Sequence, residues 1–139
     1  MAVERTLILA KPDAVRRSLA GEILARFERR GFALRAARLL RVDRELAERH
    51  YAEHAEKPFF GDLVAFITGG PTLAFVLEGE GAIATARKTI GATNPADAEP
   101  GSLRGDLASS MPDNLVHGSD SPESAQREVA LWFSVDELG

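Results

Sequence analysis

The chain has 139 residues, of which 45% are hydrophobic and 27% charged, and its net charge is −4. This length and composition are those of one soluble globular domain, so we expect a single domain over residues 1–139, with a short tail at 136–139. The lack of cysteine excludes disulfides, thiolate metal sites and cysteine nucleophiles. The acidic balance disfavours nucleic acid as a partner, and no apolar run is long enough for a membrane span or a signal peptide, so we expect a cytoplasmic protein.

Strands and helices are predicted to alternate through the first half of the chain. The apolar residues 6–10 predict a short buried strand. Apolar positions at helical spacing within 19–27 predict a helix, with Gly31 where a C-terminal cap would stand. Alternation over 32–42 predicts a second strand, and a helix capped by its first residue is expected over 43–54.

The second half continues the pattern with shorter elements. We expect helices over 60–67 and 82–90, separated by the clearest strand of the chain at 72–77. A brief strand is expected at 115–117. The last helix is predicted over 122–133, because a proline at its first position favours a helix start.

The order of these elements indicates the fold class. Without the two helices within 43–67 and the last helix, the order is β-α-β-β-α-β, the split βαβ arrangement. We therefore predict an α+β fold, a ferredoxin-like α/β sandwich with a four-stranded antiparallel sheet covered by helices. Residues 91–113 depart from the pattern, with three prolines, three glycines and no periodic apolar face. Loops this long tend to be functional, and this one leads into Asn114 and His117.

Two known motifs occur in the sequence, and we reject both. Residues 79–84 match G-x-G-x-x-A, but Glu78 and Glu80 would place carboxylates against a pyrophosphate, and the strand required after the helix is missing. Residues 50–54 spell H-x-x-E-H, the inverted zincin pattern. Histidines four apart could bind zinc, yet no third ligand is evident, and such histidines on a polar helix are usually solvated.

The segment 114–121 holds the residues best suited to chemistry. His117 is predicted at a strand end, where a neutral imidazole can act as a nucleophile and hold a phosphoryl group. Glu128 on the next helix could fix the tautomer of that ring. The alternative is a structural histidine tied to a neighbour, and the residue alone does not separate the two. The adjacent Ser119 does not indicate a hydrolase triad, because triad members converge from separate segments.

Phosphoryl transfer also requires positive charge around the moving oxygens. Lys11, Arg87 and Arg104 lie at the ends of predicted elements or in the long loop, where side chains can converge. Each such residue, taken alone, is more often a solvated surface charge. The P-loop and protein-kinase motifs are absent, so any phosphoryl transfer would use another scaffold.

Neutral and aromatic side chains complete the candidates. Thr93 and Asn114 offer donors for phosphate or sugar, although both residue types are common in loops for turn chemistry alone. Tyr51, Phe59 and Phe60 are aromatic residues near turns. One of them could stack on a base, and the alternative is packing in the core.

The whole chain resembles the nucleoside diphosphate kinase family. The matching stretches are ERTLILAKPDAV (4–15), HYAEHAEKPFFGDLVAFITGGP (50–71), ARKTIGATNPADAEPGSLRGDL (86–107) and NLVHGSDSPESAQREVALWF (114–133). The last stretch contains N-x-x-H-G-S-D, the specific signature of that family. Ala14, Gly69 and Leu107 stand where the family usually has Gly, Ser and Phe, and none of these differences touches a residue with an implied role.

The resemblance implies a ping-pong phosphotransferase that maintains nucleoside triphosphate pools. His117 matches the residue that becomes phosphohistidine, and Ser119 and Glu128 match the pair that orients its imidazole. Lys11 and Asn114 match residues that contact the ribose 3′-hydroxyl and a nearby phosphate.

The remaining matches imply a nucleotide pocket. Its phosphate clamp and its base and sugar contacts would be formed by Arg87, Thr93, Arg104, Tyr51, Phe59, Leu63 and Met111. Because aromatic stacking tolerates any base, we expect broad nucleobase specificity.

The resemblance also implies a cofactor and partners. Mg²⁺ is expected, bound mainly through the nucleotide phosphates, with ATP and other nucleoside di- and triphosphates as substrates. Self-association is expected, as a hexamer rather than a tetramer. Two other classes stay open: a ferredoxin-like nucleic-acid-binding module, which lacks its usual aromatic strand here, and a catalytically silent nucleotide sensor.

Overall fold

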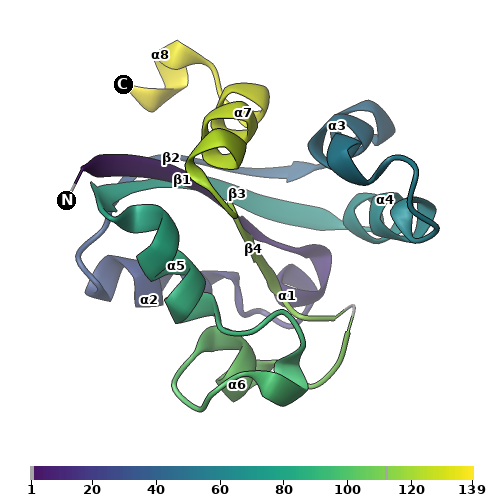
Figure 1. Ribbon diagram of the computed structural model, residues 1–139, viewed down its shortest axis with the longest axis horizontal. Coiled ribbons are helices and arrows are strands. Elements are labelled where there is room, and N and C mark those ends of the chain that lie inside the picture. The colour runs from purple at the N-terminus through teal and green to yellow at the C-terminus, as the bar shows by residue number, and fades with distance from the viewer. Residues whose placement is uncertain (1, 112) are drawn as a thin grey trace.

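A single antiparallel sheet forms the centre of the computed structural model, which describes residues 2–111 and 113–139. Its strands lie in the order β2-β3-β1-β4 (Figure 1). Their bounds are Val3–Ala10 for β1, Ala33–Arg41 for β2, Pro71–Glu80 for β3 and Val116–Gly118 for β4. All three pairings are antiparallel, which confirms the predicted four-stranded sheet and fold class.

Helices cover both faces of this sheet (Figure 1). One face carries α1 (Pro12–Arg16), α2 (Ala20–Arg29), α5 (Ala82–Ile90) and α6 (Leu103–Leu107). The other carries α3 (Arg44–His50), α4 (Phe60–Thr68), α7 (Pro122–Trp132) and α8 (Val135–Leu138). Two 3₁₀ turns, η1 (Ala52–His54) and η2 (Pro95–Asp97), lie in the connections.

The alternation of side chains along β1 divides the core into two halves. Leu7 and Leu9 point to the cluster under α7, whereas Ile8 and Ala10 point to the cluster under α2 and α5. Since both faces are covered, five consecutive residues of β1 are buried, as in strands of two-sided sheets. Phe27 anchors the second half, and burial of such a side chain stabilises the fold by roughly 1.5–3 kcal/mol.

Several short elements differ from the sequence prediction. The helix expected over 43–54 ends at His50, and a separate 3₁₀ turn follows it. A short helix that was not predicted, α1, follows β1, with Pro12 in its first turn. Residues 136–139 do not extend freely, since a capping box between Ser134 and Glu137 starts α8.

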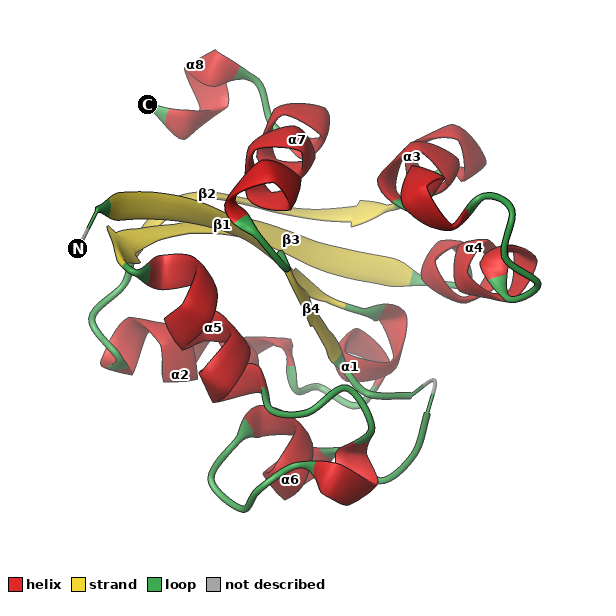
Figure 2. Cartoon of the chain, in the orientation of Figure 1, coloured by secondary structure: helices red, strands yellow, loops and turns green. Residues whose placement is uncertain are grey.

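The long loop also contains local structure. Figure 2 shows that the segment between α5 and β4 is mostly loop around α6. Asn94 caps η2 and Ser102 caps α6, each by accepting a backbone N–H. Side-chain caps of this kind hold elements that are too short to be recognised from periodicity.

One edge of the sheet exposes apolar side chains. β2 is an edge strand, and its Leu34 and Leu39 are 40% and 61% exposed.

Within the described residues, no helix has the length and apolar character needed to cross a membrane.

Candidate functional site

The turn that precedes His117 is strained and held in place by the first helix. Leu115 has a φ of 73°, which costs a residue with a side chain roughly 1–3 kcal/mol. Its N–H donates to the buried Asp13 carboxylate at 3.0 Å, and its carbonyl accepts from the Lys11 N–H at 2.9 Å. This turn delays β4 by one residue relative to the prediction and brings Asn114 beside Lys11.

His117 lies against α7 with one ring nitrogen bound. Its Nε2 is 2.8 Å from Oε1 of Glu128, and its side chain is 20% exposed. Ser119 donates from Oγ to the same Glu128 oxygen at 2.9 Å, and accepts from the Leu7 N–H at 3.2 Å. The structure therefore gathers His117, Ser119 and Glu128, which the sequence predicted to act together.

The ionised state of Glu128 fixes the tautomer of His117. Burial raises the pKa of the Glu128 carboxyl. The hydrogen bond and electrostatic attraction to His117, together with His50 and Ser119, lower this pKa by more than burial raises it, so the net shift is downward. An ionised carboxylate only accepts hydrogen bonds, so His117 must carry its proton on Nε2. Nδ1 is then the nitrogen with the free lone pair.

Arg104 is buried beside β4 and is held by backbone alone. Its guanidinium donates to the carbonyls of Gly91, Asn114 and Val116 at 3.2, 3.2 and 2.6 Å. Burial, with the nearby charge of Arg87, lowers the pKa of Arg104 to about 10, so it remains a cation at neutral pH. None of these partners is a carboxylate, and the positive charge is left available to an anion.

Lys11 and Arg87 extend this positive region. The Lys11 ammonium donates to Asn114 Oδ1 at 2.5 Å, and burial lowers the pKa of Lys11 to about 8. The Asn114 amide donates in turn to the Thr93 carbonyl at 2.9 Å. Arg87 donates to the Gly118 carbonyl at 3.3 Å and pairs with the exposed Asp120 at 2.6 Å. The predicted cations thus converge on the strand that carries His117.

The side chains predicted to contact the base and sugar take no part in the hydrogen bonds described above. Burial raises the pKa of Tyr51 to about 12, so its hydroxyl stays protonated. Phe59 immediately precedes α4, is 45% exposed and lies one helical turn from the half-buried Leu63. Met111 is 52% exposed.

His50 was expected to be solvated, and this expectation is wrong. Only 4% of His50 is exposed, and its ring lies edge-on to that of His117, with the centroids 4.7 Å apart. Its Nδ1 accepts from the Trp132 indole N–H at 3.1 Å. The helical spacing of Leu46, Ala47 and His50 was the signal that placed this histidine on the buried face of α3.

Comparison with known proteins assigns the family. Residues 4–138 match the family described as nucleoside diphosphate kinase. The chain belongs to this family. A nucleoside diphosphate kinase from Thermus thermophilus is 60% identical over 136 residues, which cover 98% of this chain and 99% of that protein. One from Rubrobacter xylanophilus is 63% identical over 131 residues, covering 94% and 98%.

Solved structures of the nucleoside diphosphate kinase family share the fold. A halophilic enzyme of this name from Halobacterium salinarum, in complex with CDP, superposes with a TM-score of 0.96 at 46% identity. The alignment covers 99% of this chain and 92% of that one. A family protein from Babesia bovis gives a TM-score of 0.95 at 45% identity, over 98% and 92% of the two chains.

Metal ligation by the protein itself is disfavoured at this kinase site. Within the described residues, the one group of three potential ligands is His50, His117 and Glu128, whose ligand atoms lie within 4.8 Å of one another. Trp132 occupies the lone pair of His50, and His117 Nε2 is protonated toward Glu128. Mg²⁺ prefers oxygen ligands, and this group offers only the carboxylate of Glu128.

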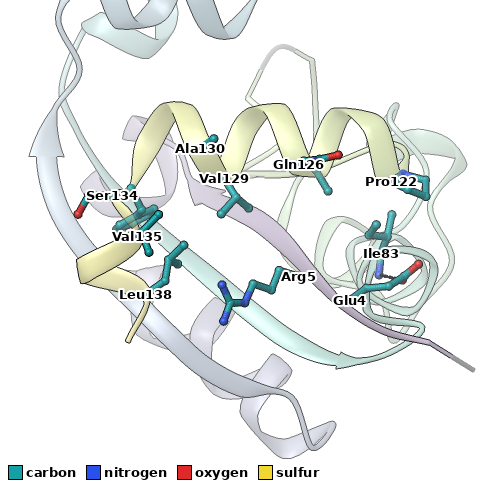
Figure 3. A pocket seen from close by; sticks show the side chains of 12 residues that line it. Glu4, Arg5, Ile83, Pro122, Gln126, Val129, Ala130, Ser134, Val135 and Leu138 are labelled. Atoms are coloured by element: carbon teal, nitrogen blue, oxygen red, sulfur yellow. Dashed lines mark hydrogen bonds between the residues drawn. The ribbon is translucent and has the colours of Figure 1, made fainter.

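The rejected dinucleotide motif has a different role. The first turn of α5 is occupied by a carboxylate, since Ile83 N–H donates to Glu4 at 3.1 Å. Figure 3 shows this bond at one end of an apolar hollow of about 560 Å³ bordered by β1, α7 and α8. None of the predicted site residues lines that hollow, so the chemistry lies elsewhere.

Proposed function

We propose that this member of the nucleoside diphosphate kinase family carries a phosphoryl group on Nδ1 of His117. A nucleoside triphosphate such as ATP donates the group, and another nucleoside diphosphate accepts it. The observation that carries the proposal is the bond between His117 Nε2 and the ionised Glu128, which leaves the Nδ1 lone pair free. Three cations bind the neighbouring residues of the same segment, 114–118. This cycle would maintain the pools of nucleoside triphosphates.

In the first half-reaction the Nδ1 lone pair attacks the terminal phosphorus. The N–P bond forms as the bond from that phosphorus to the bridging oxygen breaks, and the electron pair leaves on the diphosphate. The ring becomes positively charged, and Glu128 stabilises this charge through the Nε2–H. In the second half-reaction the incoming diphosphate oxygen attacks the same phosphorus, and the neutral imidazole is restored.

The cations supply the electrostatic part of the reaction. Arg104 and Arg87 would hold the phosphate oxygens, and Lys11 with Asn114 would bind the ribose 3′-hydroxyl and a phosphate. Their existing partners support this role, because backbone carbonyls orient Arg104 without neutralising it.

The nucleoside itself would bind against the exposed ring of Phe59. Phe59 offers a half-exposed ring on which any base can stack, with Leu63 beside it and Met111 on the opposite face. Thr93 would join the phosphate clamp, and Tyr51 would line the same pocket. The CDP complex of the Halobacterium salinarum relative supports nucleotide binding by this fold. Mg²⁺ bound to the phosphates would neutralise part of their charge.

The assembly and location remain proposals. We propose one domain over residues 1–139, in a homo-oligomer whose favoured size is a hexamer and whose alternative is a tetramer. The uncovered edge of β2, with its exposed Leu34 and Leu39, supports self-association. We expect a cytoplasmic location, and neither nucleic acid nor membrane as a partner.

A labelling experiment tests the proposed function. The protein is mixed with γ-labelled ATP, and an acid-labile, base-stable phosphoprotein is expected that discharges onto added GDP or UDP. His117→Ala should fold normally and take up no label. Label that persists in this variant would contradict the mechanism, and a folded wild type that takes up none would indicate a silent nucleotide sensor.

A further inference from the structure

One buried carboxylate, that of Asp13, contacts the strained backbone just before His117. Leu115 has a φ of 73°, and the Val116 N–H donates to the Asn114 carbonyl across it at 2.8 Å. This is a γ-turn of the rare, strained kind. Leu115 is fully buried and carries a side chain, so nothing in the residue itself relieves the strain. Contacts from other segments must therefore balance it.

The segment that begins α1 binds both polar backbone groups of Leu115. The Leu115 N–H donates to Oδ2 of Asp13 at 3.0 Å, and the Leu115 carbonyl accepts from the Lys11 N–H at 2.9 Å. Asp13 is 1% exposed, and among the described residues its carboxylate is the acceptor for this N–H. A buried N–H that loses its acceptor is costly, so removal of the carboxylate favours a turn of another shape.

The shape of this turn places the oxygens that bind two of the predicted cations. Arg104 donates to the Asn114 carbonyl at 3.2 Å and to the Val116 carbonyl at 2.6 Å. These carbonyls lie on either side of Leu115, so rotation about its N–Cα bond would turn one of them away from the guanidinium. The Asn114 side chain accepts from the Lys11 ammonium at 2.5 Å, so the same rotation would also move the partner of Lys11.

We propose that Asp13 is a positioning residue for Arg104: by accepting the Leu115 N–H, it keeps the turn in the form that directs the Asn114 and Val116 carbonyls to the guanidinium. Asp13 acts through the turn and not on the substrate. The consequence for phosphate binding rests on the function proposed above, whereas the hydrogen bond to Leu115 can be measured in the resting protein.

The first measurement is amide hydrogen exchange in ¹⁵N-leucine-labelled protein. The Leu115 signal is assigned by its loss in Leu115→Met, and the amide of Leu77, in the central strand β3, reports global stability. Relative to Leu77, Asp13→Ala should speed exchange at Leu115 roughly thirtyfold, and Asp13→Asn, which keeps an acceptor oxygen, by no more than about threefold. Equal acceleration at both amides, or none at Leu115, would overturn the proposal.

The second measurement is equilibrium binding of ADP at pH 7. Asp13→Ala should weaken binding about tenfold, the low end for a charged group that loses its orientation. Asp13→Asn keeps the hydrogen bond to Leu115 and should bind ADP within about threefold of the wild type. If the two variants lose the same affinity, the hydrogen bond is not what Asp13 contributes, and the proposal fails.

A double-variant comparison tests whether Asp13 acts through Arg104. In an Arg104→Met background the guanidinium is absent, so Asp13→Ala should weaken ADP binding by no more than about threefold there, against about tenfold in the wild type. A structural role unrelated to Arg104 would cost the same factor in both backgrounds. That result would refute the proposal.

A control separates positioning from loss of stability. Phe27 lies in the same half of the core as Leu115 but takes no part in the hydrogen bonds of the turn. Phe27→Leu should lower the melting temperature and leave ADP affinity unchanged. If it weakens ADP binding as much as Asp13→Ala does, the effect of Asp13 is one of stability and the proposal fails. A folded wild type that binds no ADP would refute the proposed function and leave amide exchange at Leu115 as the test of Asp13.

Discussion

The groups on the two sides of the His117 ring differ in whether the protein itself already satisfies their charges and hydrogen bonds. Toward α7, the ring meets Glu128 and His50, which are buried and already bound to Ser119 and Trp132. Toward the loop, it lies near Arg104 and Lys11, whose positive charges are oriented by carbonyl and amide oxygens. Within the described residues, no carboxylate forms a salt bridge with either cation, although Asp13 lies near Lys11.

This difference separates preparation of the nucleophile from recognition of the substrate. On the α7 side, every interaction acts on the ring and sets its tautomer before a nucleotide arrives. On the loop side, burial lowers the pKa of Lys11 and Arg104, which shows that their charges lack full compensation. A phosphate would supply the missing charge. Changes on the first side should therefore alter the rate, and changes on the second should alter affinity and its pH dependence.

The largest expected effect is on the α7 side. Glu128→Gln keeps the shape but loses the charge and fixes the His117 tautomer less strongly, so phosphoenzyme formation should slow roughly a hundredfold. Nucleotide affinity should change little. Single-turnover rates and equilibrium binding of ADP measure the two effects separately. Glu123→Gln, at the exposed start of the same helix, is the matched control. Equal losses of rate and affinity in Glu128→Gln would break the distinction between the two sides.

A pH series tests the loop side. Since the pKa of Lys11 is about 8, the ammonium loses its charge as the pH rises through that value, and kcat/KM should fall about tenfold by pH 9. Lys11→Arg should move this fall to higher pH, since guanidinium keeps its proton. A profile that is flat from pH 7 to 10, or one that Lys11→Arg leaves unchanged, would contradict the assignment.

Stability should change with the opposite sign over the same range. The pKa of Lys11 is lowered in the folded chain from an ordinary value of 10.5, so between about 8 and 10.5 the unfolded chain binds more protons. The free energy of unfolding should therefore rise with pH, by no more than about 3 kcal/mol. Denaturant titrations at pH 7.5 and 10 of the wild type and Lys11→Arg would show whether this rise depends on Lys11.

The smallest effect is expected from substitution of the exposed Phe59. Phe59→Ala should weaken nucleotide binding about fivefold, the low end for a stacked base, because the ring is 45% exposed. The loss should be similar for purine and pyrimidine diphosphates in binding titrations. Phe60→Ala, which removes a ring packed against the core, should lower the melting temperature more and affinity less. A loss confined to one base would contradict stacking as the basis of recognition.

The sheet and its main helices could be predicted because their signals are local. Periodicity identified the four strands and the long helices, and the family signature located His117 with Glu128 eleven residues later. Glycine at position 31 was predicted to end α2, and its φ of 98° agrees with that assignment. The short helices α1 and α6 escaped prediction, because five residues give too little periodicity and their starts depend on single residues such as Ser102.

The contacts that fix the site escaped because they join distant segments. Trp132 and His50 are 82 residues apart, and Asp13 and Leu115 are 102 apart. No pattern in one sequence indicates such pairs. The histidines at 50 and 54 were considered only as a zinc motif, and the break in the helix after His50 separates them. A buried polar residue is placed by partners that periodicity cannot reveal.

The central claim, that Nδ1 of His117 takes the phosphate, can be tested on the phosphorylated protein directly. The ¹⁵N-histidine-labelled chain is phosphorylated with ATP, and the ³¹P–¹⁵N coupling identifies the nitrogen bonded to phosphorus. Our account predicts a single phosphohistidine, substituted on Nδ1 of His117, with Nε2 still protonated toward Glu128. Phosphate on Nε2 of His117, or on any other side chain, would contradict it.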